Sequence, residues 1–572
     1  MNGPADHAAL IARLRAILGG RYILTDPRAT LRYRRGYRCG EGAAVAVVRP
    51  GSLIEQWRVV QACVAADVSI ILQASNTGLT GGSTPDGNSY PGGVVIISTT
   101  RISGLHVIDG GRQVVALPGT TLYQLERALK PLGREPHSVI GSSCIGASVL
   151  GGVCNNSGGA LVQRGPAFTQ LALYARIDAD GRLELVNHLG IQLGDDPEEI
   201  LRRLEAGDFT AEHISDDPGR WASDHGYADH VRAIDAETPA RFNADPRCLF
   251  EASGSAGKLV LFAARLDSFA KDEATATFYI GTNDIAELTA LRRAILGGFG
   301  TLPIAGEYMH RTAFDIAERY GKDSFLAIQL LGTDRLPALF AMKARVDAIA
   351  GRFRLFGKAP GDHLLQFLSR LFPTHLPARM RQWRDRYEHH LMLKMAGDGI
   401  AEARALLNGL FPSAQGDVFE CTPDEATKAF LHRFAAAGAA VRYRAVHADT
   451  VEDIVALDIA LPRNERDWFE TLPADLDARI IHKLYYGHFF CHVFHQDYVV
   501  AKGHDPLAIE HAMWDLLDAR GAEYPAEHNV GHLYKAKQAL ADFYRSIDPR
   551  NQLNPGIGQT SKARAWDDGI RP

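Results

Sequence analysis

One stretch, 137-HSVIGSSCIGASVLGGVCNNSGG-159, holds six glycines among serines and asparagines. No Asp, Glu, Lys or Arg occurs between Pro136 and Gln163. Glycine allows a backbone to approach a ligand closely, and successive exposed N–H groups form a nest that binds an anion. We therefore expect the backbone here to follow an extended, phosphate-containing cofactor.

A second glycine-rich loop, 74-ASNTGLTGGSTPDG-87, follows the apolar run 68-VSIILQ-73, which we predict to be a buried strand. The spacing G-x-G-x-x-G of a dinucleotide-binding Rossmann site and the spacing of a P-loop are both absent. Two ordinary turns are the alternative explanation, but two such loops in one domain favour a shared ligand. The expected pyrophosphate donors are Thr77, Gly78, Gly81, Gly82 and Ser83.

The bulk composition fits a globular enzyme of two or three domains. The chain has 572 residues, 46% of them hydrophobic, and a formal net charge of −5, so nucleic acid is not an expected partner. Seven cysteines without a C-x-x-C motif fit a reducing cytoplasm and argue against a disulfide framework. The N-terminus lacks the apolar core of a signal peptide, and no 18-residue apolar run is present.

The segment 321–390 differs from the rest of the chain in its charge. It holds twelve Lys and Arg against six Asp and Glu, a net of +6, which leaves −11 for the remainder. Basic residues interleaved with Leu and Phe are typical of a segment that lies on a membrane surface. A basic helical face packed on an acidic domain is the alternative. The apolar runs are 336-LPALFAM-342, 353-FRLFG-357 and 364-LLQFLSRLF-372.

The pattern of apolar residues predicts an α+β fold. We expect strands at 45–48, 68–73, 94–98 and 114–119, alternating with helices at 53–66 and 121–132. Residues 171–178 and 182–190 are expected to form an antiparallel hairpin that turns at Asp180-Gly181, with a further strand at 258–267. A new strand–helix pattern begins at 275–282.

Histidines gather near the C-terminus. His488 and His495 are seven residues apart, a spacing that suits a strand–turn–strand or one helix face. In 526-AEHNVGH-532, Glu527 adjoins His528. Imidazole with carboxylate is the usual set for a general base or a divalent metal, although the H-E-x-x-H motif of zinc proteases is absent. A hydrogen-bonded structural role is the alternative for each histidine taken singly.

Candidate anion binders precede the histidines in 383-WRDRYEHHLMLKM-395. Arg386 offers a planar fork for a substrate carboxylate. Lys394 adds a point charge. Surface salt bridges at helical spacing are the alternative for both residues.

These loops resemble the FAD-linked oxidoreductases of the vanillyl-alcohol oxidase/PCMH type. The resemblance covers the loop from Ala74, the 141–159 segment and the strand at Val260. It implies a PCMH-type FAD-binding domain with an α/β cap domain. The FAD is expected to be noncovalent, because the first loop has no histidine to tether it. The implied flavin contacts are Ala74, Ser75, Asn76, Thr77, Gly78, Gly82, Ser83, Gly141, Ser148, Gly158 and Val260.

Three further segments are similar to the quinone-dependent D-lactate dehydrogenase family of bacterial membranes: 134–159, 431-LHRFAAAGAAVRY-443 and 524-YPAEHNVGHLYKA-536. The resemblance implies oxidation of D-lactate to pyruvate, with electrons passed to a membrane quinone. It implies a peripheral protein on an anionic phospholipid surface, at the cytoplasmic face of the inner membrane. The expected parts are an FAD domain at 1–268 completed by the tail 521–572, a cap at 269–320 and 391–520, and a basic helical membrane-binding segment at 321–390.

The resemblance also implies roles for the site residues. His528 is the expected general base, paired with Glu527. Wider relatives use residues like His488, His495 and Glu527 as metal ligands, but their intervening Gly-Asp-Gly-Asn is missing here, so the metal stays open. Arg386 is similar to the family's carboxylate-binding arginine. The tail 548-DPRNQLNPGIG-558 is expected to return to the flavin domain.

Three alternatives remain at this stage. The first is a soluble, metal-assisted D-2-hydroxy acid dehydrogenase that uses another electron acceptor. The second is a membrane-surface binding module without activity. The third is a zinc hydrolase built on 527-EHNVGH-532. The colour of bound flavin separates the first alternative from the other two.

Overall fold

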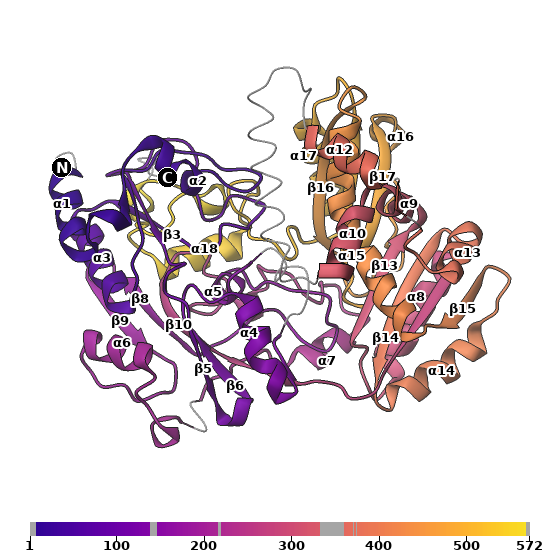
Figure 1. The fold of residues 1–572 in the computed structure, drawn as a ribbon, viewed down its shortest axis with the longest axis horizontal. Coiled ribbons are helices and arrows are strands. Elements are labelled where there is room, and N and C mark those ends of the chain that lie inside the picture. Colours follow the sequence, from indigo (N-terminus) through magenta and orange to yellow (C-terminus); the bar gives the residue numbers. More distant parts are fainter. Residues whose placement is uncertain are drawn as a thin grey trace.

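The computed structural model describes residues 7–137, 146–215, 219–331, 360–369, 371–372 and 374–567. Gly141 and the apolar runs 336–342 and 353–357 lie outside these residues. The N-terminal half forms one side of the molecule and a large sheet with its helices forms the other (Figure 1). In the part of the chain that is described, no helix is both long and apolar enough to cross a membrane.

The first sheet carries the first glycine-rich loop. Its strand order is β1-β2-β4-β3, and β2, β4 and β3 run parallel. The apolar residues of α1 (His7–Leu18) and α3 (Leu53–Ala65) pack against it. Ser52 begins α3 by accepting a hydrogen bond from the N–H of Glu55. The strands are β1 (Ile23–Leu24), β2 (Ala46–Val48), β3 (Ser69–Gln73) and β4 (Val94–Ser98).

A five-stranded antiparallel sheet follows, in the order β5-β6-β10-β8-β9. The predicted hairpin is confirmed as β8 (Ala172–Ile177) and β9 (Leu183–Asn187). The helix predicted at 121–132 is α-helical only as α4 (Leu122–Leu129), because Pro131 lies in a following 3₁₀ turn that ends at a left-handed Gly133. The other strands are β5 (Leu105–Ile108), β6 (Gln113–Ala116) and β10 (Val260–Asp267).

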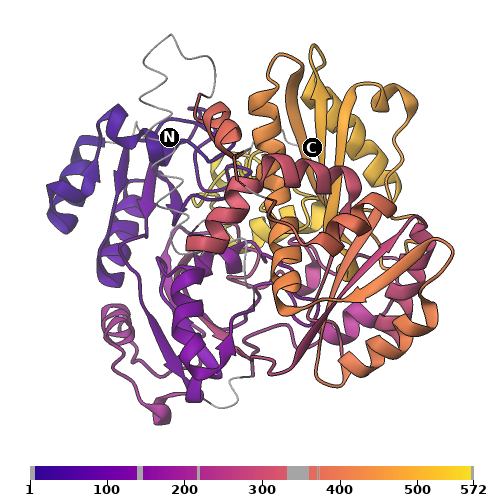
Figure 2. The same cartoon turned by 45° about the vertical axis from the view of Figure 1, so that its right-hand side comes forward.

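The C-terminal half is built on a seven-stranded antiparallel sheet, ordered β15-β12-β14-β13-β17-β18-β16. Its strands are β12 (Thr275–Thr282), β13 (Ala305–His310), β14 (His389–Ala396), β15 (Gly416–Glu420), β16 (Val451–Ala460), β17 (Ile480–His488) and β18 (Val493–Ala501). One face packs on α8 (Ile285–Gly298), α14 (Gly399–Leu410) and α17 (Pro506–Ala519). The other face packs on α9 (Arg311–Tyr320) and α15 (Pro423–Val446), and Figure 2 shows this helical layer over the sheet. We call the second face the α15 face.

Two described helices of the basic segment, α10 (Lys322–Leu331) and α12 (Pro360–Ser369), pack on α15 (Figure 1). A third, α13 (Ala378–Arg386), ion-pairs through Arg379 with Glu425 of α15 and through Arg384 with Asp315 of α9. Arg442 of α15 ion-pairs with Asp323 at 2.9 Å and with Asp362 at 2.7 Å. The outward surface of α12 and the residues after it is apolar instead of charged: Leu364, Phe367, Leu368, Leu371 and Phe372 are all exposed, Phe367 by 61% and Leu371 by 72%.

The C-terminal tail returns to the first sheet, as expected. The N–H of Ile70 donates to the carbonyl of Gln552 at 3.0 Å, and the N–H of Asn554 donates to the carbonyl of Ile70 at 2.8 Å. Lys258 is fully buried beneath the Trp566 ring, at 4.4 Å from its centre. The tail (yellow in Figure 1) therefore lies among the N-terminal elements. Asn529 contacts Thr80 of the first glycine-rich loop and Asn155 of the second.

Candidate active site

The first glycine-rich loop presents a row of unused backbone donors. Among the described residues, no N–H group from Ser75 to Ser83 donates to a protein acceptor. Asn76 (φ 53°) and Gly81 (φ 75°) have left-handed conformations, a kind of backbone that occurs in anion-binding nests. A Cβ added at Gly78 would meet no atom within 4 Å. These are the properties of a cradle that a pyrophosphate fills.

The second loop ends in a short helix beside the first loop. Ser148 caps α5 (Val149–Cys154) by accepting from the N–H of Gly151. A Cβ at Gly146 would meet empty space, whereas a Cβ at Gly158 would lie 2.5 Å from a Glu527 oxygen. Val260 is fully buried at the start of β10. The residues that are described therefore fit an extended flavin nucleotide.

Residues 527–532 join the flavin cradle to the cap. The hydroxyl of Thr80 donates to the carbonyl of Asn529 at 2.7 Å, and the side-chain amide of Asn529 donates to Asn155. The side chain of Arg241 donates to Glu527 at 2.8 Å and to the carbonyl of Leu161 at 3.1 Å. Glu527 is thus held at the edge of the cradle by the second loop.

The two histidines of the predicted pair meet Glu527 on the α15 face. His488 ends β17 and His495 lies on β18, so the strand–turn–strand expectation is confirmed. Their Nε2 atoms lie 3.3 Å and 3.9 Å from Glu527 Oε2, and the ring centres are 5.4 Å apart. We call His488, His495, Glu527 and His528 the histidine cluster.

Each histidine of the pair has a second carboxylate on its other nitrogen. His488 Nδ1 lies 2.6 Å from Glu307 Oε1, and His495 Nδ1 lies 3.5 Å from Asp458 Oδ1. Asp458 also accepts the N–H groups of Glu527 and His528, at 2.6 Å and 3.1 Å. The carboxylate of Asp458 therefore fixes the backbone that carries Glu527 and His528.

Burial and neighbouring charge set the protonation of the cluster. Burial alone would lower the pKa of His488, but Glu307 and Glu527 raise it to about 10. Burial would raise the pKa of Glu527, but His488 and Arg241 hold it well below its usual range. Burial, together with the charge of Arg433, lowers the pKa of His495 well below its usual range. The cluster thus holds a charged His488, an ionised Glu527 and a neutral His495.

The same atoms fit a divalent cation. Among the described residues, His488, His495 and Glu527 form the only group of three such side chains whose ligand atoms lie within 4.8 Å of one another. Metal-bound histidines usually have a carboxylate on the nitrogen that faces away from the metal. Glu307 and Asp458 occupy those positions here, at 2.6 Å and 3.5 Å.

The structure does not bring Arg386 to the cluster. Its side chain is 54% exposed and lies 3.4 Å from Asp417 on β15, at the far edge of the seven-stranded sheet. Lys394 lies nearer. Lys394 pairs in register with Ala305 of β13, and Glu307, two residues further along β13, pairs with His488. Paired residues, and residues two apart on one strand, share a face, so Lys394 and Glu307 are on the same face of the sheet. Of the two predicted anion binders, only Lys394 shares a face with the histidines.

Known proteins resemble this chain along nearly its whole length. The quinone-dependent D-lactate dehydrogenase of Escherichia coli K12 is 59% identical over 563 residues, 98% of each chain. Proteins of the same name from Haemophilus influenzae and Corynebacterium glutamicum are 56% and 45% identical, over 97% and 98% of this chain and 99% and 98% of their own. The chain belongs to the quinone-dependent D-lactate dehydrogenase family. Family models match as well: "FAD binding domain" at residues 44–187 and "D-lactate dehydrogenase, membrane binding" at 277–566.

Solved structures place this D-lactate dehydrogenase family member in a wider fold. p-Cresol methylhydroxylase with substrate bound matches with a TM-score of 0.59 and 12% identity, over 97% of both chains. 4-Ethylphenol oxidase from Gulosibacter chungangensis matches with a TM-score of 0.56 and 12% identity, over 100% of this chain and 99% of its own. At this identity the likeness concerns the fold alone, and it confirms the expected PCMH-type architecture.

Sequence reasoning missed four residues of the site in this D-lactate dehydrogenase family member: Arg241, Glu307, Arg433 and Asp458. Asp458 carried a usable signal, because it is the lone acidic residue in the apolar run 454-IVALDIAL-461. Glu307 and Arg433 carried weaker signals, since each lies in an ordinary amphipathic segment. Only the pairing of β13 with β17 brings Glu307 to His488.

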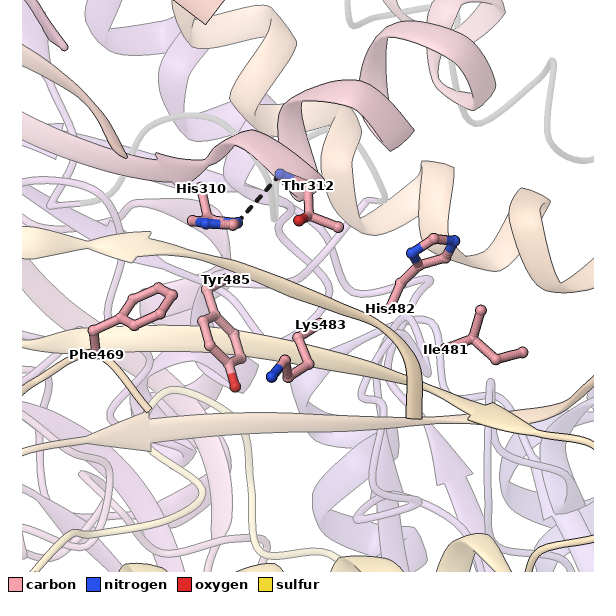
Figure 3. A pocket seen from close by; sticks show the side chains of 7 residues that line it. All are labelled: His310, Thr312, Phe469, Ile481, His482, Lys483 and Tyr485. Atoms are coloured by element: carbon pink, nitrogen blue, oxygen red, sulfur yellow. Dashed lines mark hydrogen bonds between the residues drawn. The ribbon is translucent and has the colours of Figure 1, made fainter. Parts of the chain in front are cut away.

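A separate cavity of about 170 Å³ lies in the cap (Figure 3). His310 accepts a hydrogen bond from the N–H of Thr312 at 3.2 Å, near the rings of Phe469 and Tyr485. Tyr485 alternates along β17 with Tyr486, which packs on the α15 face. The cavity is also lined by His482, which lies 3.0 Å from the Tyr443 hydroxyl of α15, so both faces of the sheet contribute to it, and none of its lining residues belongs to the histidine cluster.

Proposed function

We propose that this protein oxidises D-lactate to pyruvate, using noncovalent FAD and passing the electrons to a membrane quinone. The observation that carries the proposal is the position of Glu527 and His528, between two flavin-type loops and a charged cap face. The FAD domain of this proposal is 1–268 with the tail 521–572, the cap is 269–320 with 391–520, and the membrane segment is 321–390. The family relatives named above support this activity over the soluble, hydrolytic and non-catalytic alternatives.

In the proposed reaction the imidazole of His528 takes the hydroxyl proton of D-lactate. Its Nε2 lies 3.9 Å from Asp458 Oδ2, so the carboxylate stabilises the imidazolium that forms. Glu527, kept ionised by Arg241 and His488, lies 3.3 Å from His488 Nε2 and fixes that imidazole beside His495. FAD, when bound, supplies the two-electron acceptor. A divalent cation would displace the proton of His488, be held by His488, His495 and Glu527, and polarise the hydroxyl at the same place.

Anaerobic flavin reduction tests the activity. The purified protein should be yellow, and its absorbance near 450 nm, where oxidised flavins absorb, should bleach with D-lactate but not with L-lactate. A panel of larger D-2-hydroxy acids should bleach it more slowly, since one added methylene changes binding by about 1–3 kcal/mol. Colourless protein, or flavin that D-lactate does not reduce, would refute the proposal.

We propose further that the segment 321–390 docks on anionic phospholipid at the cytoplasmic face of the inner membrane. Each Lys or Arg near an anionic surface contributes about 1 kcal/mol, and the segment carries a net charge of +6. The exposed apolar side chains of α12 add a contribution that salt does not screen. Together they support a peripheral docking surface.

Substituting Phe367 and Leu371 with glutamine should weaken sedimentation with anionic vesicles by about 3 kcal/mol, because each removes an inserting apolar side chain. Quinone reduction in membranes should fall, while reduction of a soluble dye stays unchanged. Leu410→Gln, at an exposed site on α14, is the matched control. If the double variant loses dye reduction and quinone reduction equally, these residues support the fold instead of membrane binding, and the docking proposal is wrong.

A further inference from the structure

Arg433 of α15 is a buried cation that lies next to the histidine cluster. It is 9% exposed, and its guanidinium carbon lies 4.7 Å from the centre of the Tyr486 ring. Tyr486 and His495 pair in register on the α15 face, with ring centres 5.6 Å apart. The guanidinium therefore sits on the cap side of the cluster, where a small acid beside His495 would meet it.

The hydrogen bonds of this guanidinium are incomplete. Nε lies 2.8 Å from Glu307 Oε2, an ion-pair distance without the alignment of a hydrogen bond. Nη2 is inaccessible to solvent and has no acceptor among the described residues. Glu307 is shared with His488, which holds its other oxygen at 2.6 Å. Leaving charged donors buried and unpaired is costly, so the free edge of Arg433 is suited to an incoming carboxylate.

Neighbouring cations are less suited to this role. Arg241 already donates to Glu527 and to two carbonyls of the second loop. Arg386 is at the far edge of the sheet. Lys394, on the same face as Glu307, can supply a point charge but not a bidentate fork. Arg433 keeps two guanidinium nitrogens without a hydrogen-bond acceptor among the described residues, Nε and Nη2, whereas Arg241 keeps only Nε.

We infer that Arg433 binds the carboxylate of the 2-hydroxy acid substrate, holding its carbinol carbon between the histidine cluster and the flavin cradle. This inference rests on the proposed oxidation of D-lactate and names the group that anchors the acid. In D-lactate the hydroxyl and the carboxylate are on adjacent carbons. When the hydroxyl is directed at His528, the carboxylate therefore points to Arg433 on the other side of His495. Lys394 supplies an additional positive charge.

The test compares D-lactate with D-lactamide, whose neutral amide replaces the carboxylate. The ratio of kcat/KM for the two substrates does not depend on how much of the enzyme is folded. In Arg433→Met this ratio should fall about a hundredfold, the effect expected on losing a buried charge-assisted pair. Each folded chain of the variant should still bind one FAD. Arg433→Lys should recover part of the ratio.

Arg442→Met is the matched control. Arg442 is on the same helix, is 8% exposed and also has a buried guanidinium nitrogen without an acceptor, but its carboxylate partners belong to α10 and α12. Its ratio should equal that of the parent. A ratio unchanged in Arg433→Met, or lowered equally in Arg442→Met, would overturn the inference. If Arg433→Met yields no FAD-containing protein, an unchanged ratio in Arg433→Lys overturns it instead. Failure of the parent to reduce its flavin with D-lactate would refute the proposed function itself.

Discussion

His528→Ala should slow anaerobic flavin reduction by D-lactate by about a hundredfold or more, the usual contribution of a general base, and should leave FAD bound. The side chain of His528 is 38% exposed and touches the protein chiefly through Asp458, 3.9 Å from Nε2. The backbone at His528 is held by its own N–H group, which donates to Asp458, and this hydrogen bond is retained in the alanine variant. The loss should therefore appear in the rate and not in the flavin content, as stopped-flow absorbance can show.

His511→Ala is the control for this experiment. His511 is an exposed residue of α17 that packs against Trp514, outside the cluster. Its variant should reduce flavin at the parent rate. Parent-like reduction in His528→Ala would move the base to His495, the neutral imidazole on the other side of Asp458.

Local sequence signals predicted the elements of the fold well. The strands at 68–73, 94–98 and 258–267 are confirmed nearly to the residue, because each is a short apolar run bounded by turn residues. The order of the seven-stranded sheet was beyond such reasoning. Its neighbours β13 and β17 are some 170 positions apart in the chain, and only tertiary packing decides that they pair.

The residues of the candidate site also differ in whether a local sequence signal or only tertiary packing identifies them. Glu527 and His528 were found because they are adjacent, and His488 and His495 because a hairpin brings seven-residue spacing together. Arg386 was predicted from a short motif, but it ends α13 (Ala378–Arg386) and stacks on Trp383 and Tyr387 instead. Charge and residue type identify a cation, whereas sheet order decides which cation reaches the site.

Gly78→Val should abolish FAD binding while leaving the fold intact. A Cβ at Gly78 meets no protein atom within 4 Å, and its backbone is not left-handed. A branched side chain is therefore tolerated by the protein itself and opposed only by whatever fills the cradle. The flavin content of the purified variant, measured after denaturation, should be close to zero, and its far-UV circular dichroism should match the parent.

The choice of position makes this substitution informative. A side chain at Gly82, in the same loop, would press on Asn529 at 2.9 Å, so loss of FAD there would mix flavin contact with damage to the tail. Gly409→Val is the control, because Gly409 lies on α14 with equally open space around its Cβ position. Its variant should keep one FAD per chain. If Gly78→Val does so too, the unpaired N–H groups of the loop from Ser75 to Ser83 face water and not a pyrophosphate, and the cradle must be sought along the second loop.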